Sequence, residues 1–379
     1  MRLYHLTLHF SCAKDLEGIF TKLGHSVDTR SLSGHNRVMN IPTPSMPMFD
    51  PAHLWTDFVK AKKWERFKAE HGADVDACDA VVVTYPTMFS MLYHGWNKPI
   101  IVQAPIRFDY GILHLPADWQ YMNKFLRERI DAGKLFFVAN NLHDKYYAEH
   151  FLDREVTHIP SLCEYMGRKW NPAATRYAMY LRGGWPGLPG QIEPREAVFP
   201  DGYSWDVLNN VKAIVHFPYA TSTMSVFEFY TGNFPMFIPS HEFACEMYAR
   251  NEKSAAEPIL WHWCNTKLFN PLNGPVGPPP CSPIKCADGR EGVPDPNMST
   301  EIESFRYWTK YCDFYDKTNM PHIQLFNSMQ ELSEMTTQGN SKYVDCQAVS
   351  NAMAEHNKTR IPKVYEQWRQ LLAKVEAAK

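Results

Sequence analysis

The 379-residue sequence lacks long apolar runs and lacks an excess of either charge. No stretch approaches the ~18 consecutive apolar residues that a membrane-spanning helix needs, so the sequence predicts no transmembrane segment. Its 39 Lys and Arg residues nearly balance its 41 Asp and Glu residues, and the net charge is −2. A protein that binds nucleic acid through the phosphate backbone usually carries a basic excess, so we expect no nucleic-acid partner.

A disulfide framework and a secretory signal are also missing. The nine cysteines are scattered without regular spacing. The first residues alternate like a strand, with His5 and His9 inside the apolar stretch and no small-residue cleavage site after it. These features predict reduced thiols and a cytoplasmic protein.

Motifs for cofactors and metals are scarce. Neither a Walker loop nor G-x-G-x-x-G follows the first strand, which argues against a P-loop NTPase and against dinucleotide binding there. Asp74 and Asp76 form an Asp-x-Asp pair, but it precedes the next apolar run in a polar turn, which favours a capping role or a solvated segment over a metal site. A zinc site could be assembled only from His262, Cys264, Cys281 and Cys286. Cys281 and Cys286 form a Cys-x4-Cys pair in a Pro-rich loop, but the second Cys pair of a typical zinc site is missing, so this prediction is weak. We therefore expect no metal and no cofactor.

Apolar runs alternate with helical patterns over the first 170 residues. Near-continuous apolar runs at 80–84, 99–104 and 135–139 are typical of parallel strands covered on both faces. The intervening helical patterns cover residues 16–23, 87–95, 118–132 and 142–152. Because parallel strands need long crossovers, residues 1–170 are predicted to form a doubly wound, Rossmann-like α/β domain, with an irregular insertion at 31–60.

A second series of strands and helices follows a linker-like segment at 170–172. Predicted strands cover 177–182, 211–217 and 234–238, and predicted helices cover 224–230, 241–250 and 301–316. This pattern predicts a second Rossmann-like domain over residues 173–345. It contains a long Pro-rich surface loop at 271–296. Residues 346–379 are predicted to form an amphipathic helix that Pro362 kinks.

One segment of the second domain combines several features of a diphosphate site. A buried strand ends at His216, and the hydroxyl residues Thr221, Ser222 and Thr223 precede a helix. The free N–H groups and the positive dipole end of a helix suit a diphosphate, and hydroxyl groups can cap the helix or bind phosphate. Glu228, about one turn further on, is placed to accept hydrogen bonds from a ribose.

This segment resembles the donor-binding loop and helix of GT-B glycosyltransferases, which carry Ser-x-x-Glu and then Gly and x-Pro before the next strand. The chain has Ser225, Glu228, Gly232 and Pro235 in this order. The Glu-to-Pro spacing of seven matches, whereas the glycine lies one position early. The chain is also similar to the nucleotide-sugar glycosyltransferases that large DNA viruses of algae encode.

The resemblance implies two Rossmann-like domains and a terminal helix that crosses back to the N-terminal domain. It implies that the C-terminal domain binds the nucleotide sugar and that the N-terminal domain binds the acceptor. Retaining members often have a second glutamate eight residues before the one that matches Glu228, in the pattern Glu-x7-Glu, and plant-type inverting members have a histidine at that earlier position. In this chain the earlier position is Ala220. The stereochemical outcome stays open, with inversion favoured.

Further candidates come from the ends of other strands. Arg182 precedes a glycine-rich turn and could hold a phosphate with its guanidinium, or lie on the surface. Glu242 could contact donor hydroxyls, or favour the first turn of a helix. In the N-terminal domain, Asp109 follows a buried strand and lies two residues from Arg107, which would keep it ionised as a general base. Asp15, in the turn after the first strand, is the reserve base, and His94 and His114 are the further candidates if neither carboxylate is the base.

These observations predict a metal-independent glycosyltransferase. It would move a hexose or pentose from a UDP- or GDP-sugar to a hydroxyl acceptor such as a glycan. The base of the nucleotide, the sugar, the acceptor and the oligomeric state are left open. Two alternatives remain, a non-catalytic two-domain protein that binds a small ligand and a nucleotide-sugar epimerase of the same architecture.

Overall fold

The computed structural model describes residues 1–39, 42–49, 58–112, 116–180, 188–199, 204–218, 220–254 and 301–379. Two compact units divide this part of the chain. Unit 1 contains Met1–Ser161 and Val364–Lys379, and unit 2 contains residues 162–254 and 301–363. The predicted linker residues 170–172 therefore lie within unit 2, where the Trp170 indole donates a hydrogen bond to the carbonyl of Lys212 (2.9 Å).

Unit 1 contains a parallel sheet of six strands in the order β2-β1-β3-β4-β5-β6. The strands are β1 (Arg2–Thr7), β2 (Ser26–Ser31), β3 (Ala80–Val83), β4 (Ile100–Ala104), β5 (Leu135–Ala139) and β6 (Thr157–His158). Every residue of β3 and β4 is buried, as their apolar sequences predict for strands covered on both faces. The order reverses direction at β1, so the carboxyl ends of β1 and β3 flank the point where the two halves of the sheet diverge.

Helices connect these strands. They are α1 (Phe10–Lys22), α2 (Lys63–Asp76), α3 (Pro116–Asp131) and α4 (Leu142–Leu152), with the shorter 3₁₀ turns η1 (Gly34–Met39), η2 (Pro47–Phe49) and η3 (Thr87–Tyr93). Asp74 and Asp76 lie in the last turn of α2, so their prediction as a polar turn was wrong. The α2 sequence continues helical to that point, and Asp76 accepts a hydrogen bond from the indole of Trp96 (2.9 Å).

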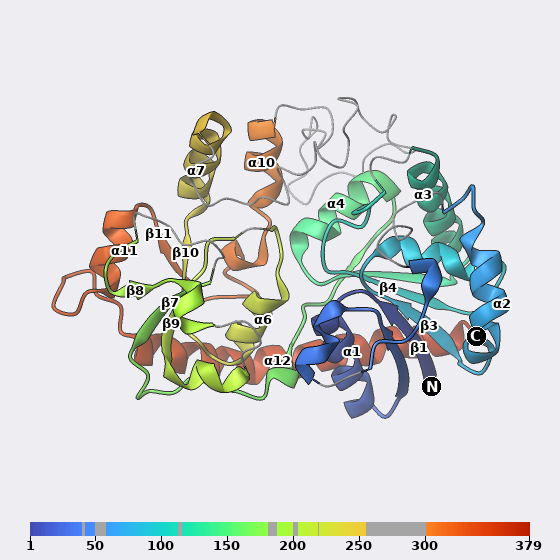
Figure 1. Ribbon diagram of the computed structural model, residues 1–379, viewed down its shortest axis with the longest axis horizontal. Coiled ribbons are helices and arrows are strands. Elements are labelled where there is room, and N and C mark those ends of the chain that lie inside the picture. The colour runs from blue at the N-terminus through green and yellow to red at the C-terminus, as the bar shows by residue number, and fades with distance from the viewer. Residues whose placement is uncertain are drawn as a thin grey trace. The chain divides into compact units, whose positions relative to one another are not determined.

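Unit 2 contains a second parallel sheet, in the order β11-β10-β9-β7-β8. Its strands are β7 (Arg176–Met179), β8 (Ile192–Glu193), β9 (Val211–Val215), β10 (Met236–Pro239) and β11 (Gln324–Phe326). Its helices are α5 (Arg195–Val198), α6 (Met224–Thr231), α7 (His241–Ser254), α10 (Glu301–Thr309) and α11 (Met329–Thr336), with the 3₁₀ turns η4 (Glu164–Met166), η5 (Trp205–Asn210) and η6 (Asp313–Tyr315). Figure 1 shows β7, β9 and β10 together, with α6 beside them.

The core of unit 2 is built mainly from apolar side chains of the strands and of helices α7 and α11. It includes Met179, Val215, Phe217, Phe237, Phe243, Phe326 and Leu332. The helix predicted over 301–316 is shorter in the structure. Helix α10 ends at Thr309, and the separate 3₁₀ turn η6 follows after a turn. Strand β11 and helix α11 were not predicted, since β11 has only three residues and shows no clear alternation.

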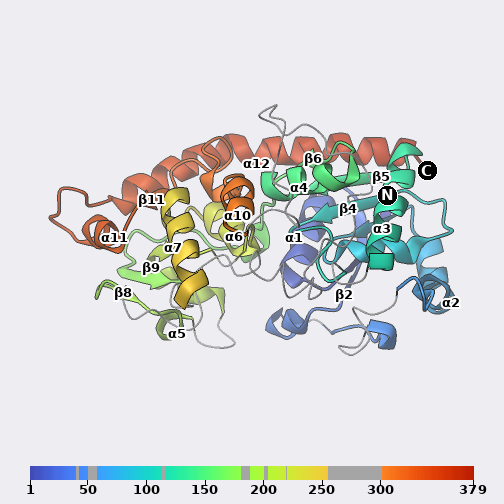
Figure 2. The same cartoon turned by 90° about the horizontal axis from the view of Figure 1, so that it is seen from above.

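The last helix, α12 (Cys346–Ala377), runs through Pro362 as one element (Figure 2). Its residues from Val364 on belong to unit 1. There the Trp368 ring meets Phe20 of α1 edge-on (5.1 Å between centroids), and Gln367 donates to the carbonyl of His158 (3.2 Å). The prediction of an α/β chain with two doubly wound parallel sheets and a terminal helix that returns to the first is confirmed.

Candidate functional site

In unit 2 the order of the strands reverses between β9 and β7. Ligands of open α/β sheets bind outside the carboxyl ends of the strands at such a reversal, because the flanking loops separate there. The segment after β9 leads through His216, Thr221, Ser222 and Thr223 into α6. The predicted donor loop therefore lies at the reversal point of the unit 2 sheet.

The hydroxyl groups at the start of α6 are buried and incompletely hydrogen-bonded. Ser222 and Thr223 are each 8% exposed, and Thr221 is 3% exposed. Thr223 is the N-cap residue, yet its side chain makes no capping hydrogen bond to the helix. It instead accepts one from the Ser225 hydroxyl (3.1 Å). The Ser222 hydroxyl oxygen has no hydrogen-bond partner among the described residues.

This arrangement leaves several donors near one another at the start of α6. The first-turn N–H groups of a helix carry its positive dipole end, and in α6 that of Val226 donates to the carbonyl of Thr223 (3.1 Å). A buried hydroxyl without a partner costs about 1–3 kcal/mol, so Ser222 is better satisfied with a ligand that accepts its hydrogen bond. A phosphate group would accept hydrogen bonds from both kinds of donor.

Glu228 lies one turn into α6 and is only 4% exposed. Its carboxylate accepts a hydrogen bond from the hydroxyl of Tyr165, in η4. Glu228 is therefore not a solvated helix residue, because both burial and a specific donor hold this side chain. A carboxylate has further lone pairs, so it can accept from Tyr165 and from a ribose at the same time.

The end of α6 is shaped by two residues with different roles. Asn233 adopts the left-handed conformation (φ 62°), whereas Gly232 does not. A Cβ atom at Gly232 would lie 2.6 Å from the Phe234 ring and 2.7 Å from the Met166 side chain, so this glycine is required by space. The Asn233 side chain accepts a hydrogen bond from Asn357 of α12 (2.8 Å).

The other predicted donor residues differ in their surroundings. His216 is fully buried, and burial lowers its pKa to about 4, so the ring is neutral at pH 7. Glu242 is exposed in the first turn of α7, after the carboxyl end of β10. Arg182 lies outside the described residues.

The corresponding reversal in unit 1 lies between β1 and β3. His9 follows β1 and is the N-cap residue of α1, and Tyr85 follows β3. Their rings meet edge-on with 6.0 Å between centroids. Burial, and then the nearby His35, lower the pKa of His9 to about 4, and its Nδ1 atom has no hydrogen-bond partner among the described residues. A neutral imidazole at a reversal point can take up a proton.

His9 was not among the residues predicted as a proton acceptor. Its signal was a histidine directly after the first strand, at the start of a helix. Its position became informative only with the strand order, which shows that the sheet diverges at β1. The phenol of Tyr85 is a further polar group there, and burial raises its pKa, which keeps it protonated.

Asp109 follows β4, as predicted, but its carboxylate is completely buried. Oδ2 accepts hydrogen bonds from the Tyr147 hydroxyl (3.0 Å) and the Trp119 indole (3.2 Å). The Arg107 guanidinium lies 3.5 Å from Oδ1 and stacks on the Tyr147 ring at 4.3 Å from its centroid. Arg107 thus pairs with the Asp109 carboxylate within a closed network.

The remaining candidates of unit 1 lie elsewhere. Asp15 is 3% exposed and lies in the second turn of α1, not in the turn after β1, because α1 already begins at Phe10. His94 follows η3, on the amino-terminal side of β4. His114 and the cysteines of the weak zinc candidate lie outside the described residues. Within the described ranges, no group of three His, Cys, Asp or Glu side chains could hold a metal ion.

Comparisons with known proteins complete this description. No protein-family model matches the chain, and no curated protein matches it. Two solved structures are similar at low levels. The glycotransferase of kitacinnamycin has 10% identity and a TM-score of 0.35, with 100% of this chain and 95% of that one covered. The calicheamicin glycosyltransferase has 12% identity and a TM-score of 0.34, with 82% and 92% covered. Of the helices that the structure describes, none has the length and apolar character to span a membrane.

Proposed function

We propose that the protein is a GT-B glycosyltransferase that moves a sugar from a UDP- or GDP-sugar to an acceptor hydroxyl, on a glycan or a similar molecule. The observation that carries the proposal is the start of α6. Buried hydroxyls of Ser222 and Thr223 meet a helix N-terminus there, at the reversal point of the unit 2 sheet. The Ser-x-x-Glu, Gly and Pro pattern of the same segment supports it.

The donor half follows from these contacts. The diphosphate binds the first-turn N–H groups of α6 and the Ser222 hydroxyl, and Glu228 accepts hydrogen bonds from the ribose. When the sugar leaves, negative charge grows on the diphosphate. Prearranged N–H and O–H donors stabilise that charge without needing to reorganise, and removing one such donor typically slows a reaction by about 10²–10³-fold. This arrangement would dispense with a metal ion.

The acceptor half uses a proton acceptor of unit 1. The acceptor oxygen attacks the anomeric carbon, the bond from that carbon to the diphosphate oxygen breaks, and the acceptor proton moves to the enzyme. His9 suits this step because its imidazole is neutral at pH 7 and partly exposed at a sheet reversal. The carboxylate of Asp109 is less suited, because three side chains already bind it. A single displacement of this kind inverts the anomeric configuration.

Nucleotide binding tests the donor half directly. We expect UDP or GDP to bind the full-length protein in calorimetry, and Ser222→Ala to weaken that binding about tenfold or more, since a hydrogen bond to a charged group contributes ~1.5–3 kcal/mol. Ser204→Ala is the matched control, because Ser204 is an exposed serine of the same unit. Binding should persist in EDTA.

Three results would contradict the proposal. The first is that neither UDP nor GDP binds. The second is that Ser222→Ala binds the nucleotide as tightly as the wild type. The third is that a chelator abolishes nucleotide binding and Mn²⁺ restores it. Product analysis then separates the alternatives. Transfer to an added acceptor or slow hydrolysis supports a glycosyltransferase, an altered nucleotide sugar without acceptor indicates an epimerase, and binding without turnover indicates a binding protein.

A further inference from the structure

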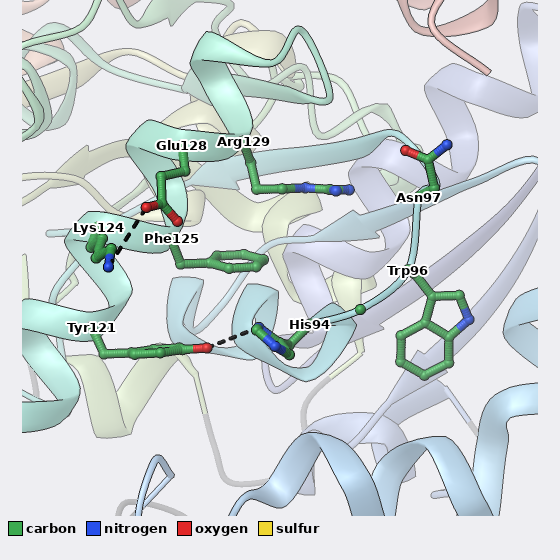
Figure 3. A pocket seen from close by; sticks show the side chains of 9 residues that line it. His94, Trp96, Asn97, Tyr121, Lys124, Phe125, Glu128 and Arg129 are labelled. Atoms are coloured by element: carbon green, nitrogen blue, oxygen red, sulfur yellow. Dashed lines mark hydrogen bonds and ion pairs between the residues drawn. The ribbon is translucent and has the colours of Figure 1, made fainter.

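A cavity of about 470 Å³ lies in unit 1, away from the reversal between β1 and β3. Residues His94 to Asn97, just before β4, line one side, and residues of α3 from Tyr121 to Arg129 line the other (Figure 3). These segments lead into β4 and β5, so the cavity lies at the amino-terminal edge of the sheet, whereas His9 and Tyr85 lie at the carboxyl edge. Its volume is within the range of small-molecule sites, about 300–1,000 Å³.

One wall of the cavity is aromatic. The Tyr121 hydroxyl and His94 Nδ1 are hydrogen-bonded (2.8 Å), and the Trp64 ring stacks on Tyr121 at 5.6 Å and 7°. Phe125 lies next to His94, with 6.4 Å between ring centroids. His94 is exposed, and Tyr121 and Trp64 are half-buried. Because Trp64 covers one face of Tyr121 and Phe125 is only 7% exposed, the His94 ring is the part of this wall most open to a planar group.

The other notable feature is the guanidinium of Arg129. Its Nη2 donates to the carbonyl of Lys98 (2.7 Å), but its buried Nε has no hydrogen-bond partner among the described residues. In Figure 3 the side chain passes the Phe125 ring and points toward Asn97. Burial lowers the pKa of Arg129, and no carboxylate of the described residues offsets that loss of hydration. The acidic residue of the lining, Glu128, pairs with Lys124 at 3.8 Å.

We propose that this cavity binds a small organic anion that carries a flat ring. The ring packs against Phe125 and the Tyr121–His94 pair, and the anionic group, a carboxylate or a phosphate, accepts hydrogen bonds from Arg129. The Nη1 and Nη2 end of a planar guanidinium matches both anions, because each anion presents two oxygens to that fork, whereas the buried Nε faces the protein interior. The lining residues do not include any residue of the proposed donor loop, so this proposal does not depend on the proposed function.

Calorimetry or saturation-transfer NMR on the full-length protein tests the proposal. The probes are 4-hydroxybenzoate for the carboxylate, phenyl phosphate for the phosphate and 4-hydroxybenzamide as the neutral analogue. We expect at least one anion to bind, with the neutral analogue at least tenfold weaker. Arg129→Gln should weaken binding of the anion at least tenfold, and Arg129→Lys should restore only part of it. Arg66→Gln removes the same charge from an exposed pair with Glu70 and should change nothing.

A second variant guards against loss of the fold in Arg129→Gln. Asn97→Trp adds bulk at an exposed lining position while keeping the guanidinium, and it should also abolish binding. The proposal is overturned if neither anion binds at millimolar concentration, if the neutral analogue binds equally well, or if Asn97→Trp binds like the wild type. Saturating UDP should leave anion binding unchanged, and competition by UDP would move the anion to the nucleotide site.

Discussion

Glu228 is a buried carboxylate with two separable roles, because the Tyr165 hydroxyl binds it and a ribose is proposed to bind it as well. Glu228→Gln keeps the shape but removes the charge. We expect nucleotide affinity to fall about ten- to a hundredfold, as for the loss of hydrogen bonds to a charged acceptor. Calorimetry with UDP and GDP measures this change.

The control for Glu228 is Tyr165→Phe, which removes the internal hydrogen bond and leaves the carboxylate in place. It should lower stability by about 1–3 kcal/mol in urea unfolding, with a smaller effect on nucleotide affinity. If Tyr165→Phe and Glu228→Gln reduce affinity equally, Glu228 acts by holding η4 and not by contacting the nucleotide.

The identity of the proton acceptor is decided by three substitutions in parallel. His9→Gln should lower turnover by about 10²–10⁴-fold while donor affinity stays the same, as expected for loss of a general base. Asp109→Asn should mainly lower stability, because it breaks a buried ion pair with Arg107. Asp15→Asn, the third variant, should leave turnover unchanged if His9 is the proton acceptor. Turnover assays and urea unfolding of each variant separate the two effects, and a large loss of turnover in stable Asp109→Asn would restore that carboxylate as the base.

At the level of elements, the end of α6 depends on close packing. The Cβ atom of Gly232→Ala would overlap with Phe234 and Met166, so we expect a loss of about 1–3 kcal/mol from forced repacking. Gly190→Ala in the same unit is the matched control, because a Cβ there meets nothing within 4 Å. Urea unfolding curves give both values. Equal stability of the two variants would mean that η4 and the Phe234 ring adjust freely.

For the whole molecule, buried histidines predict how stability depends on pH. Burial lowers the pKa of His5 to about 3 and of His216 to about 4, and burial with nearby His35 lowers that of His9 to about 4. The unfolded chain protonates these rings near pH 6.5, whereas the folded protein does not. Between pH 6.5 and 4 the unfolded state therefore binds more protons, and stability falls as the pH is lowered.

Urea unfolding from pH 7.5 to 5 measures this dependence. In His5→Asn the slope below pH 6.5 should be smaller by up to ~1.4 kcal/mol per pH unit, whatever the overall stability of the variant. His322→Asn replaces an exposed histidine with a residue that tolerates its left-handed backbone (φ 70°), and it should keep the wild-type slope. An unchanged slope in His5→Asn would show that His5 is protonated within the fold.

The sequence by itself determined the class of fold and the position of the hydroxyl-rich segment before α6, which we propose as the donor loop. The run 80–83 is apolar throughout and the run 100–104 is apolar except for Gln103, a pattern typical of strands covered on both faces. Hydroxyl residues before a helix identify a helix start wherever the helix lies. Both conclusions follow from the sequence because the burial pattern of a strand and the start of a helix depend on residues that are neighbours along the chain.

Only the tertiary structure decided which of these groups are exposed, which are paired and which meet from distant parts of the chain. The sequence could not show that Tyr165 binds Glu228, since 63 positions separate them. Nor could it show that Asp109 is enclosed by Tyr147 and Trp119. Likewise, His9 gained its significance from the order of strands, which long crossovers decide. Burial and hydrogen bonding depend on how whole layers pack, and no local pattern encodes that packing.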